Sequence, residues 1–182
     1  MATMAQGSRR FLTADEQARM IRYSALTRDR LSKVKICADP ALRGKGFART
    51  IGNVIYVDPY VAPQDCLADT SDGAWLAHEL AHVHQYATRG FLWTLKSAAS
   101  TFFENKFELE GPAHHYQWSR NWTADGDMPA TAFSRLSAER QASAVEDLYR
   151  LEHGAAPQAA YDADTRVLSL NPVALRAWIF GR

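Results

Sequence analysis

The sequence predicts a single α+β domain that is mostly helical and contains a small sheet. Short runs rich in β-branched residues occur at residues 33–38 and 53–57, and such runs are typical of strands. Much of the remaining chain shows helical periodicity between capping residues. A chain of 182 residues, with 47% hydrophobic and 23% charged residues, can bury one ordinary core. We therefore expect residues 1–182 to form one domain.

The first third of the chain supplies one helix and two strands. Thr13 and Glu16 have capping-box spacing, which predicts a helix from residue 13 to about residue 25. Residues 33–38 alternate between polar and apolar side chains and predict a strand. Residues 53–57 predict the strongest strand of the chain. The Asp-Pro pair that follows is expected to end it.

A helix is predicted for residues 72–89. Asp72 is expected to cap it, and Gly90 is a natural stop after it. Apolar side chains recur along one stripe, which should face the core: Leu76, Leu80, Val83 and Ala87. A neighbouring stripe carries His78, His82 and Gln85.

The C-terminal half predicts three further helical stretches and one short strand. They are an amphipathic stretch at residues 92–105, a helix from residue 137 to residue 153, a strand at residues 167–170, and a helix through residue 179 with Asn171 as cap and Pro172 in its first turn. Residues 111–129 are aromatic and are expected to be irregular.

The motif His78-Glu79-Leu80-Ala81-His82 lies within the predicted helix 72–89. Residues four apart on a helix point the same way, so the two histidines can offer two imidazole nitrogens to one Zn²⁺. Glu79 is turned to the side of that face, where it is better placed to accept a proton from water than to bind the metal. Two histidines and a glutamate on a solvated helix face are the alternative interpretation, and the motif favours zinc.

A catalytic zinc normally has three protein ligands, so a third is needed. Glu139 on the predicted helix 137–153 is the favoured candidate, because Ala142 and Ser143 would let this helix approach closely. Glu146, on the same face, is the alternative ligand. Asp147 could instead hold a ligand histidine in the correct tautomer.

A second group of candidates lies at His114, His115 and Tyr116. The two histidines are further candidate ligands, because imidazole also suits zinc. With Tyr116 they could equally line the substrate cleft and donate hydrogen bonds to an oxyanion. We take His115 and Tyr116 as candidate catalytic residues.

Charge and cysteine content narrow the classes of partner. A net charge of +1 gives no reason to expect nucleic acid or an anionic membrane, and no apolar run is long enough to span a bilayer. Arg9 and Arg10 are not followed by an apolar region, so no export signal is expected. Cys37 and Cys66 form no Cys-x-x-Cys pair, and two unpaired thiols are favoured over a disulfide.

The order of strand, motif helix and later glutamate resembles the zincin metallopeptidases whose third ligand is glutamate. Residues 77–86 are similar to the corresponding segment of small Vgr-related proteins encoded near type VI secretion spikes, and to a metallopeptidase domain at the C-terminus of some spike proteins. Residues 53–59, 111–116, 137–142 and 145–147 agree with that group. At His84 an aromatic residue, and at His114 and His115 tyrosines, are more common there.

The resemblance implies a zinc site of His78, His82 and Glu139 with Glu79 catalytic, in a small zincin-like fold whose edge strand borders the motif helix. It implies a peptidase acting as an antibacterial effector, made in the cytoplasm and secreted into the periplasm of a target cell. A protein or peptide substrate, a Vgr-type spike protein and a cognate immunity protein are the expected partners.

Two other functions fit the same motif. The chain could be an inactive secretion adaptor that keeps zinc for stability, or a zinc amidase that acts on peptidoglycan. For a peptidase, the strand at residues 53–57 is expected to receive the substrate as an added strand, with Tyr56 in contact with it.

Overall fold

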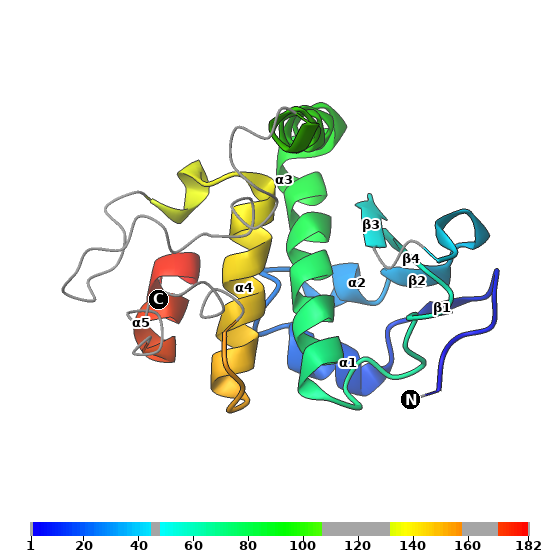
Figure 1. The fold of residues 1–182 in the computed structure, drawn as a ribbon. Coiled ribbons are helices and arrows are strands. Elements are labelled where there is room, and N and C mark those ends of the chain that lie inside the picture. Colours follow the sequence, from blue (N-terminus) through cyan, green and yellow to red (C-terminus); the bar gives the residue numbers. More distant parts are fainter. Residues whose placement is uncertain (1, 45–47, 107–131, 158–170, 182) are drawn as a thin grey trace.

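The computed structural model describes residues 2–44, 48–106, 132–157 and 171–181. Within these ranges the fold is α+β, as predicted, with one four-stranded sheet and five α-helices. The strands are β1 (Arg9–Phe11), β2 (Lys35–Ala38), β3 (Ala48–Ile51) and β4 (Val54–Val57), and the helices are α1 (Ala14–Met20), α2 (Arg28–Leu31), α3 (Thr70–Lys106), α4 (Ala138–Glu152) and α5 (Pro172–Phe180). Helix α3 lies between α4 and the sheet (Figure 1).

The sheet has the order β1-β2-β4-β3, with β2 and β4 parallel and both outer pairs antiparallel. The expectation that the strand at residues 53–57 receives a substrate as an added strand requires it to lie at an edge of the sheet. It is wrong, because β4 is paired on both sides. Its continuous apolar run is typical of a central strand. Of the two outer strands in the described sheet, β3 is the one that contacts α3.

Alternation along the strands decides which side chains face α3. Thr50 is in register with Ile55, which in turn is in register with Ile36, and all three are buried. Tyr56 is in register with Arg49, so it lies on the opposite face of the sheet. The Arg49 guanidinium carbon lies 5.3 Å from the centre of the Tyr56 ring. Tyr56 is thus turned away from the motif helix, and its expected contact with a substrate stays a prediction.

Helix α3 contains both arms that the sequence predicts, joined at Gly90. That residue has φ 78° and ψ 173°, which interrupts the helix where a stop was expected. The first arm begins earlier than predicted, at Thr70, because the Asp69 carboxylate accepts a hydrogen bond from the Asp72 N–H at 2.8 Å. Asp69, rather than Asp72, is therefore the capping side chain. Leu76, Leu80 and Val83 are fully buried, as predicted.

Helices α3 and α4 pack in an antiparallel pair (Figure 1). Gln85 donates to the Ala138 carbonyl at the start of α4, at 3.0 Å, whereas Gly73 lies against Tyr149 near its end. Ala142 and Ser143 are buried, in agreement with the expectation that small side chains allow close approach. This pairing brings two segments that are distant in the sequence into contact along several turns.

Substituting Gly73 with alanine is expected to destabilise the protein by about 1–3 kcal/mol. Helix propensity alone would favour alanine by about 1 kcal/mol. However, the added Cβ would lie 2.5 Å from Tyr149 Cζ and 2.7 Å from its Cε1, so the buried Tyr149 ring or the two helices would have to shift. Urea unfolding measures the change, with exposed Ser71→Ala as the control. A Gly73→Ala protein more stable than the wild type would contradict the close packing.

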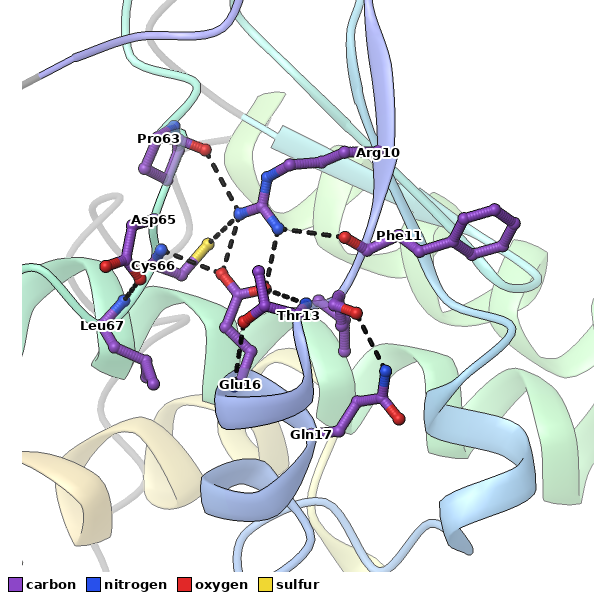
Figure 2. A network of polar contacts seen from close by, with 10 residues as sticks. Arg10, Phe11, Thr13, Glu16, Gln17, Pro63, Asp65, Cys66 and Leu67 are labelled. Carbon is purple, nitrogen blue, oxygen red and sulfur yellow. Dashed lines mark hydrogen bonds and ion pairs between the residues drawn. The ribbon is translucent and has the colours of Figure 1, made fainter.

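The N-terminal segment is held by a polar network around Glu16 (Figure 2). The fully buried Glu16 carboxylate accepts hydrogen bonds from the two terminal nitrogens of the Arg10 guanidinium, at 2.7 and 2.8 Å. It also accepts the backbone N–H groups of Thr13 and Cys66, at 2.8 and 2.9 Å. The predicted capping box at Thr13 is present, although α1 ends at Met20 rather than near residue 25. Glu16 thus joins β1, α1 and the loop before α3.

Stability is expected to depend on Glu16 at acid pH. Burial alone would raise the pKa of this carboxyl, but hydrogen bonds from Arg10 and from the Thr13 and Cys66 N–H groups lower it overall. The contribution of the Glu16 carboxylate to the free energy of unfolding is therefore complete above the pKa of glutamate in the unfolded chain, about 4.3. It is lost as pH falls through the lower pKa of Glu16 in the folded protein. Glu16→Gln is expected to cost about 3 kcal/mol at neutral pH.

Urea unfolding of both proteins between neutral and acid pH tests this prediction. The difference between them should shrink as pH falls. Asp29→Asn is the control, because its pair with Lys33 is exposed on both sides and should contribute little. An unchanged difference across this range would show that the Glu16 charge is not what stabilises the network.

The remaining predictions fall into three groups. The last helix is capped by Asn171 with Pro172 in its first turn, as expected, and both cysteines are buried free thiols. The irregular stretch at residues 111–129 and the strand at residues 167–170 lie outside the described residues. Over the described part of the chain, no helix combines the length and apolar character that crossing a membrane requires.

Candidate metal centre

His78 and His82 occupy successive turns of α3 and point toward one position. Their Nε2 atoms are 3.2 Å apart. Glu139, in the first turn of α4, reaches the same position: its Oε2 lies 3.5 Å from His78 Nε2 and its Oε1 lies 3.5 Å from His82 Nε2. The ligand atoms of these three residues all lie within 4.8 Å of one another. The antiparallel packing of α3 and α4 thus assembles the group that the motif predicted.

The two imidazole nitrogens and the carboxylate, and the spacing between them, fit a cation with tetrahedral coordination. Zinc prefers imidazole nitrogen and carboxylate oxygen at about 2.0–2.2 Å, which places tetrahedral ligands about 3.3 Å from each other. The two Nε2 atoms are 3.2 Å apart, and each lies 3.5 Å from a different oxygen of Glu139, so the three side chains approach that spacing. His78, His82 and Glu139 are therefore the residues that could hold a zinc ion.

The electrostatics of the centre also favour a cation. Burial lowers the pKa of His78, but the carboxylates of Glu139 and Glu146 outweigh it and hold that pKa well above its usual value. The pKa of His82 is raised in the same way against burial, chiefly by Glu139. The two histidines in turn hold the pKa of Glu139 far below its usual range, again against burial. A metal ion would displace the histidine protons that this negative environment attracts.

Glu146 lies on the other side of the His78 ring. Its Oε2 is 3.1 Å from His78 Nδ1, and its Oε1 accepts hydrogen bonds from Arg150 at 2.8 and 3.3 Å. Glu139 is the carboxylate that faces both Nε2 atoms, so the geometry favours Glu139 over Glu146 as the third ligand. A carboxylate beside His78 Nδ1 can fix the ring orientation, which is the kind of role that was expected for the neighbouring Asp147.

Glu79 is turned toward the sheet rather than into the ligand group. Its side chain is buried, and its Oε2 accepts a hydrogen bond from Thr50 Oγ1 on β3 at 2.6 Å. Its negative charge still contributes to raising the pKa of both motif histidines, so it lies close to them. Sequence reasoning did not identify Thr50, although its alternation within Ala48–Ile51 is the signal that could have placed it facing α3.

His114, His115 and Tyr116 lie outside the described residues. Their expected roles as further ligands or oxyanion donors stay predictions. The structure therefore brings His78, His82 and Glu139 together, with Glu79 beside them. A function has to be inferred from this geometry, because comparisons of the chain with models of protein families, with curated proteins and with solved structures found no match.

Proposed function

We propose that this protein is a zinc-dependent metallopeptidase of the zincin type. His78, His82 and Glu139 hold the zinc ion, and Glu79 is the general base. The observation that carries the proposal is the convergence of His78, His82 and Glu139, whose ligand atoms all lie within 4.8 Å of one another. Beside them lies a buried glutamate, Glu79, that is held by a separate hydrogen bond.

The chemistry divides between the metal and the side chains. Zinc, when bound, lowers the pKa of water toward about 7 and polarises a carbonyl group. Glu79 accepts a proton from the water that attacks the peptide carbonyl carbon, and delivers it to the nitrogen as the C–N bond breaks. Thr50 donates to one Glu79 oxygen, so it orients the carboxylate and leaves the other oxygen available for this proton.

The position of β3 at the edge of the sheet, among the strands that the structure describes, is the best support for a peptide substrate. An extended peptide can add to an exposed edge strand through backbone hydrogen bonds. Thr50 lies on this strand and its side chain reaches the catalytic base, so a peptide added beside it would pass close to Glu79. The substrate strand thus belongs beside β3, in place of the β4 segment that the sequence suggested.

Delivery and biological role rest on the sequence resemblance. On that basis, the proposed protein is delivered by type VI secretion together with a Vgr-type spike protein. It acts in the target-cell periplasm and has a cognate immunity protein. Against the adaptor alternative, structural zinc sites usually have four protein ligands. In the described part of the chain, the group that could hold a metal has three. The amidase alternative uses the same residues and differs only in substrate.

Metal analysis and two substrates test the proposal. The purified protein is expected to contain one zinc per chain and to cleave casein, and a chelator should abolish that cleavage. Purified sacculi incubated in parallel address the amidase: release of cross-link peptides without casein cleavage would favour it. A zinc-loaded protein that is inactive on both substrates would favour the adaptor, and a protein that never binds metal would exclude the proposed centre.

A further inference from the structure

We propose that Gln85 and Gln141 are positioning residues of the metal centre. They fix the tautomer of His82 that can bind a cation, and they attach the first turn of α4, which carries Glu139, to α3. This inference rests on the proposed function because it concerns the same centre. It is carried by a chain of hydrogen bonds that starts at backbone carbonyl groups.

The chain starts at the Leu136 carbonyl, which can only accept a hydrogen bond. Gln141 Nε2 donates to it at 2.9 Å. This fixes which end of the Gln141 amide is the NH₂ group and leaves its Oε1 as an acceptor. Gln85 Nε2 lies 3.3 Å from that oxygen, so Gln85 must present its NH₂ group to Gln141.

A second carbonyl leads to the same orientation of Gln85. Its Nε2 also donates to the Ala138 carbonyl at 3.0 Å, which again can only accept. The Gln85 Oε1 atom therefore faces His82 Nδ1, at 2.9 Å. An amide oxygen can only accept, so Nδ1 carries the proton. In the neutral ring Nε2 then has its lone pair free, and it is Nε2 that points toward His78 and Glu139.

Burial makes this orientation hard to reverse. Gln85 is 3% exposed and Gln141 is 4% exposed, so neither amide can exchange its partners for bulk water. Rotating either amide by a half turn would set two donors or two acceptors against each other, which is costly in a buried site. The carbonyl groups of Leu136, just before α4, and of Ala138, its first residue, therefore determine which nitrogen of His82 is available to a metal.

The same amide also couples the two helices that supply the ligands. Gln85 is on α3, three residues after His82, and its NH₂ group holds the carbonyl of Ala138, the residue before Glu139. One side chain thus orients one ligand and seats the helical turn that carries another. Mutating a side chain that orients a metal ligand in this way typically lowers metal affinity about 10–100-fold.

Three variants separate the tautomer from packing. Gln85→Leu and Gln141→Leu break the chain with side chains of similar size. Gln85→Glu still places a carboxyl oxygen next to His82 Nδ1 in either protonation state, but it loses the paired NH₂ donation. Gln17→Leu is the control, because Gln17 lies on a different helix, α1, and donates to the Leu12 carbonyl. Zinc affinity is measured by competition with a chromophoric chelator, and stability by thermal unfolding in EDTA.

The two leucine variants are expected to bind zinc about 10–100-fold more weakly. Gln85→Glu is expected to stay within about tenfold of the wild type although it unfolds at least as readily as Gln85→Leu. Gln17→Leu should leave the affinity unchanged. If the affinities of all variants simply follow their stabilities, the amides are structural only and the inference is overturned.

Imidazole ¹⁵N NMR of the zinc-free wild-type protein provides a test that needs no variant. At a pH where the rings are neutral, His82 should carry its proton on Nδ1. A proton on Nε2 would overturn the inference even if zinc binds. A wild-type protein that binds no zinc but shows the Nδ1 tautomer would instead overturn the proposed function and leave the tautomer assignment intact.

Discussion

Replacing Glu79 with glutamine is expected to lower the rate of peptide hydrolysis about 10²–10⁴-fold, the usual contribution of a positioned general base. The amide has nearly the same shape, and its oxygen can still accept the hydrogen bond that Thr50 donates. It cannot take a proton from water. Zinc content and stability should therefore stay close to those of the wild type. Casein cleavage and metal analysis on the same preparation measure both quantities.

Thr50→Val and Thr50→Ser refine this experiment. Valine has the same shape as threonine but lacks the hydroxyl that holds Glu79, so a smaller loss of rate is expected with zinc still bound. Serine keeps the hydroxyl and should restore most of the rate. A Glu79→Gln protein that retains full activity would rule out Glu79 as the base. One that loses its zinc would show that Glu79 belongs to the ligand set.

Glu139→Gln is expected to weaken zinc binding by more than the roughly 10–100-fold typical of residues that only support a ligand. Its carboxylate faces both Nε2 atoms, and an amide is a poor zinc ligand. Zinc at a hundred times its dissociation constant adds about 2.7 kcal/mol to stability, and the variant should lose most of this gain. Thermal unfolding with zinc and with EDTA measures the difference.

Glu146→Gln is the matched comparison, because it makes the same chemical change about two turns further along the same face of α4. The amide oxygen can still accept from His78 Nδ1, so zinc affinity should stay within about tenfold of the wild type. The opposite ranking, with Glu146→Gln the more damaging change, would assign the third ligand to Glu146.

Local signals in the sequence were enough to predict the elements that carry the ligands. The histidine spacing, the apolar stripe of α3 and the stop at Gly90 all depend on neighbouring residues. So do the caps at Thr13 and Asn171. The position of Glu139 on a helix with small neighbours was also visible, but its choice over Glu146 became clear only from the packing of α4 on α3.

The features that were missed depend on partners far away in the chain. Strands β1 and β3 are short, so they carry little periodicity. Which strand lies at the edge is decided by pairing, and the run Val54–Val57 was wrongly given that place. The roles of Gln85 and Gln141 could not be predicted either, because the orientation of each amide depends on distant acceptors such as the Leu136 carbonyl.

The antiparallel pairing of α3 and α4 has a consequence for the order of events during refolding. His78 and His82 can be in place as soon as one helix forms, which takes about a microsecond. Glu139 arrives only after two helices that are far apart in the sequence have met, which is a slower step. The appearance of tight metal binding after dilution from denaturant should therefore lag behind the helical circular dichroism signal, and the delay would report when the second helix docks.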